Sequence, residues 1–153
     1  ITRHLQMKKI LPITGLLLFL VACKAPAKTT DNQTILTLSS VTGNFIDDYG
    51  IRYSISDKLW MQHPNIKYHI IRWNDKEKYL IARNDTNNPS EAGLYTRIDY
   101  MFFQHMEPFT WGFCLTVYNA KTEKEAATKA QADRQNPKIG CGGFPFSRIK
   151  RLE

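Results

Sequence analysis

Ile66-Lys-Tyr-His-Ile-Ile-Arg-Trp73 and Lys78-Tyr-Leu-Ile-Ala-Arg83 are two runs of strand-forming residues that lie four residues apart. β-Branched and aromatic residues are frequent in both runs, as is typical of β-strands. The linking residues, Asn74-Asp-Lys-Glu77, favour a turn, because Asn and Asp side chains hydrogen-bond to the nearby backbone and tolerate unusual backbone angles. This segment therefore predicts an antiparallel β-hairpin, the clearest one in the chain.

Further short runs of this kind lie on both sides of the hairpin. We expect strands at residues 34–40, 45–46, 51–56, 58–62, 94–103, 109–118 and 144–152. Many short strands separated by Asn, Asp, Gly and Pro are typical of an antiparallel barrel or sandwich. The sequence thus predicts a mainly β fold, a compact antiparallel β-barrel or sandwich, as a single domain over residues 34–153.

One short α-helix is expected inside this domain, near residues 122–132. Thr122 and Glu125 have the spacing of a capping box, in which the threonine hydroxyl accepts a backbone N–H and the glutamate reaches back. Four alanines follow, and Asn136-Pro137 ends the helical pattern. Because the apolar face consists only of alanine, the helix must pack very closely or hardly at all.

The composition fits a globular chain. There are 153 residues, 42% of them hydrophobic and 23% charged, with a formal charge of +7. The length fits one domain, and the apolar fraction excludes wholesale disorder. Only one stretch, near the N-terminus, is continuously apolar, which excludes a membrane protein with several spans.

Residues 1–22 predict a secretory signal peptide whose true start is Met7. Two lysines follow Met7, and the apolar residues 10–22 then lead to Cys23. This apolar run is too short for a membrane-spanning helix, which needs about 20 residues. Removing residues 1–22 lowers the formal charge from +7 to +4, because Arg3, Lys8 and Lys9 are lost.

Leu20-Val21-Ala22-Cys23 resembles the lipobox of bacterial lipoproteins. The resemblance implies that Cys23 becomes the first residue and carries a covalent acyl lipid such as palmitate, with residues 23–33 as the lipidated cysteine and a flexible tether. Lys24, in place of Asp, is similar to the pattern of outer-membrane lipoproteins. The alternative is a secreted protein in which Cys23 lies near the cleavage site by chance. We expect no other cofactor, and an exported chain argues against a nucleic-acid partner.

Cys114 and Cys141 are the two cysteines that remain. In an oxidising compartment such a pair predicts a disulfide. The rival interpretation, a metal site, lacks clustered histidines, so we expect no metal. Trp111-Gly-Phe-Cys114 and Gly140-Cys-Gly-Gly-Phe144 together resemble a group of uncharacterised secreted bacterial proteins and lipoproteins that end in this glycine-rich motif. The resemblance implies a shared β-rich domain over about residues 43–149, and it supplies no activity or catalytic residues that could be transferred to this chain.

No recognisable catalytic motif is present, so we expect a protein that is not an enzyme. The aspartates that could serve acid–base chemistry lie mostly beside turns: Asp47, Asp48, Asp57, Asp75 and Asp99. The histidines His63, His69 and His105 are scattered through separate elements. The segment from Asp85 to Asn88 is similar to the start of a calcium loop but lacks the later Gly and Glu, which favours a solvated turn.

The aromatic side chains are the strongest candidates for ligand contact, with Trp60, Trp73, Trp111 and Tyr100 foremost. They could line a pocket or simply fill the core. The basic residues Arg148, Lys150 and Arg151 could protect an edge strand from aggregation or contact lipid phosphates.

These observations favour a lipid-anchored outer-membrane protein with a non-catalytic binding role toward an envelope protein, a glycan or a small amphiphile. The alternatives are a calycin-like carrier of a small amphiphile, an inhibitor of a host enzyme such as lysozyme, and a hydrolase.

Overall fold

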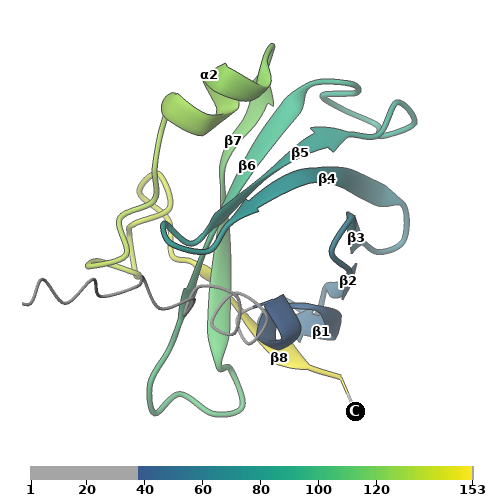
Figure 1. Cartoon of the computed structure of the whole chain (residues 1–153). Coiled ribbons are helices and arrows are strands. Elements are labelled where there is room, and N and C mark those ends of the chain that lie inside the picture. The colour runs from purple at the N-terminus through teal and green to yellow at the C-terminus, as the bar shows by residue number, and fades with distance from the viewer. Residues whose placement is uncertain (1–37, 153) are drawn as a thin grey trace, which may run out of the picture.

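The strands of this chain close into a single barrel, seen in a computed structural model that describes residues 38–152 (Figure 1). Each strand pairs antiparallel with the next, and β8 returns to pair with β1. The strands are β1 (Gly43–Asp47), β2 (Arg52–Ile55), β3 (Leu59–Gln62), β4 (Ile66–Asn74), β5 (Tyr79–Asn84), β6 (Tyr95–Phe102), β7 (Trp111–Ala120) and β8 (Ser147–Arg151). The prediction of a mainly β antiparallel fold is confirmed, and of its two architectures the barrel is the one observed.

The predicted hairpin forms β4 and β5, with Asn74 paired to Tyr79 at its closed end. The Asn74 side chain accepts a hydrogen bond from the Glu77 amide (3.0 Å), which is the turn role expected of asparagine. Lys78 completes the turn with φ +54°. The local turn chemistry and the strand pattern therefore agree.

Alternating residues of the strands point into the barrel and form its core. Aromatic side chains contribute much of the volume, and Phe45, Trp60, Tyr100 and Trp111 are each 1% exposed. The rings meet edge to face, a favourable geometry for aromatic pairs; the Trp60 and Phe113 centroids are 4.9 Å apart. The interior at the middle of the barrel is thus packed with side chains.

The helix α2 spans Glu123–Thr128 and lies against the outside of the barrel (Figure 1). The capping box is confirmed, since Glu125 donates its amide to the Thr122 hydroxyl (3.1 Å). Ala126 is fully buried against the sheet, so the alanine face packs closely. The helix ends earlier than residue 132 because the Arg97 guanidinium donates to the Ala127 carbonyl (2.6 Å), which satisfies an acceptor at the end of the helix.

Two other expectations are corrected. The strand expected at residues 34–40 is wrong over its described part, because residues 38–41 are helical. The amide and the hydroxyl of Thr42 both donate to the Leu38 carbonyl, and these two hydrogen bonds close a helical turn. The edge-strand explanation of Arg148, Lys150 and Arg151 is also wrong, because β8 pairs with a strand on each side.

Within residues 38–152 there is no helix long and apolar enough to cross a membrane.

Candidate functional site

Three of the four candidate ligand-contact aromatics lie in the barrel core. Trp60, Trp111 and Tyr100 belong to one buried cluster, in which the two indoles meet edge to face with centroids 6.2 Å apart. Trp73 packs against the same cluster and donates its indole N–H to the Asp57 carbonyl (2.9 Å). The structure therefore gives these residues packing roles, and surfaces for binding have to be sought at the ends and on the outside of the barrel.

The indole N–H groups of Trp60 and Trp111 have no hydrogen-bond partner among the described residues, although both are buried. An unpaired buried donor is unfavourable and calls for a physical explanation. Each of these indoles is in edge-to-face contact with neighbouring rings, an arrangement in which an N–H can meet a π face.

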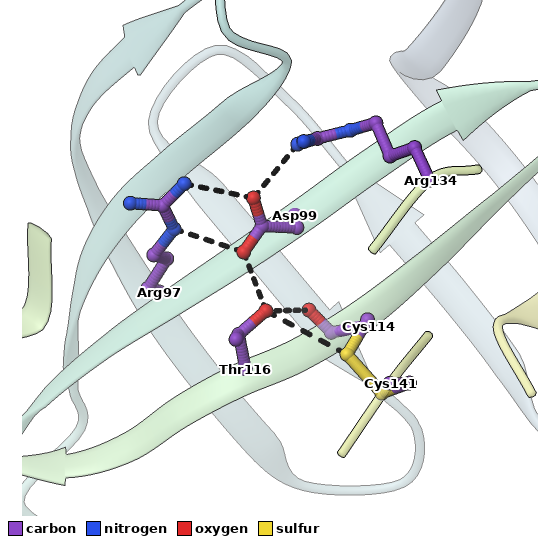
Figure 2. Close-up of a disulfide and its surroundings, with 6 residues drawn as sticks. All are labelled: Arg97, Asp99, Cys114, Thr116, Arg134 and Cys141. Carbon is purple, nitrogen blue, oxygen red and sulfur yellow. Dashed lines mark hydrogen bonds and ion pairs between the residues drawn. A yellow bond between two sulfur atoms is a disulfide. The ribbon is translucent and has the colours of Figure 1, made fainter. Parts of the chain in front are cut away.

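A buried charge cluster joins strand β6 of the barrel to Arg134, in the segment that follows helix α2 (Figure 2). Asp99, fully buried on β6, accepts two hydrogen bonds from Arg97 (2.8 and 2.9 Å) and one from Arg134 (2.7 Å). The Thr116 hydroxyl donates a fourth. The Arg97 guanidinium also lies 3.9 Å from the centroid of the Tyr79 ring. Every polar atom of the Asp99 carboxylate is therefore engaged, so this cluster is structural.

The Cys114–Cys141 disulfide is confirmed, and it fastens the segment of residues 129–146 beside this cluster (Figure 2). The glycines beside Cys141 allow a close backbone approach and positive φ angles. A Cβ on Gly140 would lie 1.9 Å from the Asp133 carbonyl oxygen, and Gly142 and Gly143 have φ of +61° and +94°. The disulfide and the glycines together fix the path of this segment over β6 and β7.

An apolar groove of about 300 Å³ lies where this segment meets the barrel. Its walls come from four parts of the chain: Asp48 and Tyr49 after β1, Phe103 and Met106 after β6, Pro137, Lys138, Pro145 and Phe146 before β8, and Arg148 on β8. The Phe103 ring packs closely against Gly112, and a Cβ at position 112 would lie only 2.8 Å from the ring. The glycine therefore makes room for the ring.

Large apolar side chains are exposed in this groove and on the covering segment that forms one of its walls. Tyr49 is 70% exposed and Met106 38%, and Ile139 and Phe144, from the same covering segment, are 62% and 73% exposed. Exposed apolar side chains that line a groove, as Tyr49 and Met106 do, are typical of an interaction surface.

The charges of the groove are mainly basic. Arg148 pairs with Asp48 (Nε–Oδ2 2.8 Å) and lies over the Phe109 ring, as does Lys150. Lys138 makes no ion pair with any residue of the described range. The groove therefore offers one uncompensated positive charge beside an apolar floor.

A second cavity, more open and more polar, lies outside β1–β3 and contains Ser54 and His63. Ser54 Oγ lies 2.8 Å from His63 Nε2, a distance that would suit a nucleophile and its base. However, the Ser54 hydroxyl donates its only proton to Asn44 Oδ1 (2.9 Å). The histidine must then donate to Ser54, so the pair as arranged does not activate a nucleophile.

The remaining polar candidates lie apart from one another. His69 forms a hydrogen bond with Asp85 Oδ2 (2.7 Å), and this bond, together with one from the Asn87 amide (2.8 Å), lowers the pKa of Asp85 to about 2. Asp47 accepts a hydrogen bond from the Tyr53 hydroxyl, and Asp75 accepts one from the Tyr100 hydroxyl (both 2.9 Å). Over residues 38–152 no group of three His, Cys, Asp or Glu side chains is arranged to hold a metal ion. Cys23 lies outside the described residues.

The sequence analysis did not identify the groove or the buried cluster. A signal for the cluster was present in β6, where Arg97 and Asp99 alternate with the core residues Ile98 and Tyr100. Charged residues on the second face of such a strand predict that this face is exposed to solvent, unless another element covers it. The groove had no local signal, because its residues come from four separated segments.

The fold defines a class, the closed eight-stranded antiparallel β-barrel with an added outer helix and a disulfide-fastened segment. Comparisons with protein-family models, curated proteins and solved structures give no match to this chain.

Proposed function

We propose that this chain is a lipid-anchored protein of the bacterial envelope that binds a second envelope protein without catalysis. The anchor rests on the lipobox-like residues 20–23, and the binding role rests on the groove. A lipid on Cys23 would hold the barrel at the membrane, and several acyl chains give stable attachment.

The observation that carries the binding role is an exposed apolar groove beside an uncompensated lysine. Met106 and Tyr49 would remain in contact with water unless a partner covered them. Lys138 would attract a carboxylate at the same place. The partner that fits is a protein segment with an apolar side chain for the groove and an acidic residue next to it.

Site-specific photo-crosslinking in the source bacterium tests this role. A photoreactive phenylalanine analogue replaces Tyr49 at the groove, and in a matched control it replaces Ile71, which is 43% exposed on β4. We expect one discrete adduct from position 49 and none from position 71. Met106→Asp should abolish the adduct, because a carboxylate would enter the apolar floor, and Lys138→Glu should reduce it several-fold.

The result that would contradict the proposal is an adduct from position 49 that persists at full yield in Met106→Asp. Equal adducts from positions 49 and 71 would contradict it too, since they would mean contact without a preferred surface. Met106 is partly exposed, so its replacement should leave the fold intact; an unchanged melting temperature checks this.

A further inference from the structure

A separate cavity of about 170 Å³ opens at one end of the barrel. Ile66 and Tyr68 of β4 and Leu115 of β7 give it apolar walls, and all three pack on the central core. The loop between β5 and β6 contributes Asn88 and Glu91. A cavity of about 150 Å³ is large enough for benzene, so this one has room for a six-membered ring with a small polar group.

The wall formed by the loop is fixed by buried amide side chains. The Asn88 side chain accepts a hydrogen bond from the Lys67 amide (2.9 Å) and donates one to the Lys67 carbonyl (2.8 Å). These two bonds attach the loop to β4. Asn84 donates to the carbonyls of Glu91 (2.9 Å) and Tyr118 (3.1 Å), which ties the loop to β7. These bonds preform the cavity, as is typical of sites for small molecules.

Tyr68 provides a polar group that no described residue binds. Its side chain is 8% exposed, and its hydroxyl makes no hydrogen bond with any residue of the described chain. Burial raises the pKa of this phenol, so the hydroxyl keeps its proton and stays a donor. By contrast, the buried hydroxyls of Tyr53 and Tyr100 each donate to a carboxylate. An unused donor beside apolar walls is complementary to a ligand with a single acceptor.

The charge at the rim restricts the ligand further. Among residues 38–152, Glu91 is the carboxylate that lines this cavity, and no basic side chain lines it. An anion would meet repulsion there, whereas a neutral molecule would not.

We propose that this end of the barrel binds a small neutral molecule with an apolar ring or short chain and one oxygen that accepts a hydrogen bond from the Tyr68 hydroxyl. This site is distinct from the groove, and its residues come from different elements.

Cyclohexanone and methylcyclohexane are suitable probes, because they have similar shapes and only the first carries an acceptor. We expect cyclohexanone, added to the full-length protein, to shift the methyl NMR signals of Ile66 and Leu115. Tyr68→Phe should weaken cyclohexanone binding about 3–10-fold, as expected for one hydrogen bond, and leave the response to methylcyclohexane unchanged. Leu115→Trp should abolish binding of both probes by filling the cavity.

Equal affinity of Tyr68→Phe and the parent protein for cyclohexanone would overturn the proposal, as would an Ile66 methyl shift that persists in Leu115→Trp. Met106→Asp serves as the control for the groove and should bind cyclohexanone normally. Because Met106→Asp affects only the groove, a failure of the cyclohexanone test would not contradict the proposed partner binding. A failure of the partner-binding test would likewise not contradict the small-molecule site.

Discussion

Replacing Asp99 with asparagine is expected to lower the free energy of unfolding by about 3–5 kcal/mol, the usual cost of breaking a buried ion pair by removing one partner. Arg97 is 1% exposed, so its charge would stay buried without a counter-ion at this position, and one of its two hydrogen bonds to Asp99 would be replaced by an N–H facing the NH2 of asparagine. Arg134 can turn toward water, since its side chain is 28% exposed, but Arg97 cannot. Urea unfolding measured by tryptophan fluorescence gives the value.

Asp57→Asn is the matched control, because Asp57 is exposed, and it should change the unfolding free energy by less than about 0.5 kcal/mol. The double variant Arg97→Met with Asp99→Leu should lose less than Asp99→Asn alone, since removing both charges leaves neither unpaired. A loss below about 1 kcal/mol in Asp99→Asn would show that the cluster is not a main support of the fold.

Replacing both Cys114 and Cys141 with alanine is expected to cost about 3–4 kcal/mol, the chain-entropy value for a loop of this length. The cysteines are 27 residues apart in sequence. The melting temperature should fall by about 10–20 °C, as measured by calorimetry without reductant.

The loss should be concentrated in the covering segment. Hydrogen exchange in the double cysteine variant should rise most over residues 129–146, and least in the β4–β5 hairpin, which contacts neither cysteine. Dithiothreitol should bring the parent protein to the same melting temperature as the variant and leave the variant unchanged. A parent protein whose melting is insensitive to reductant would contradict this role.

The mainly β antiparallel fold could be predicted from local information, but the choice between a barrel and a sandwich could not. The strand runs, the Asn74 turn and the Thr122 capping box each depend on a few neighbouring residues, and the structure confirms them apart from the strand expected at residues 34–40. The helix end was missed because it depends on Arg97, which is 30 residues away from Ala127. The same limit applies to the helical turn at residues 38–41, which is held by the Arg151 guanidinium through the carbonyls of Ser39 and Ser40.

The sites were less predictable than the fold. Aromatic residues that could have lined a pocket pack the core, because closure of the barrel turns alternate side chains inward. The two cavities depend on how loops meet after folding: Met106 and Phe146 come together across 40 positions, and Asn88 reaches Lys67 across 21. Neither pairing has a signal in the spacing of residues along the chain.

The intact mass of the protein, extracted from its own membranes in mild detergent and kept unreduced, tests most directly that it is a lipid-anchored binding protein. We expect a chain that begins at Cys23, with the mass of attached acyl chains and one disulfide, and a heavier species containing a second protein that disappears in Met106→Asp. Cys23→Ala should lose the acyl mass. A chain cleaved elsewhere, or one beginning at Cys23 without lipid, would contradict the anchor, and a heavier species unaffected by Met106→Asp would contradict binding through the groove.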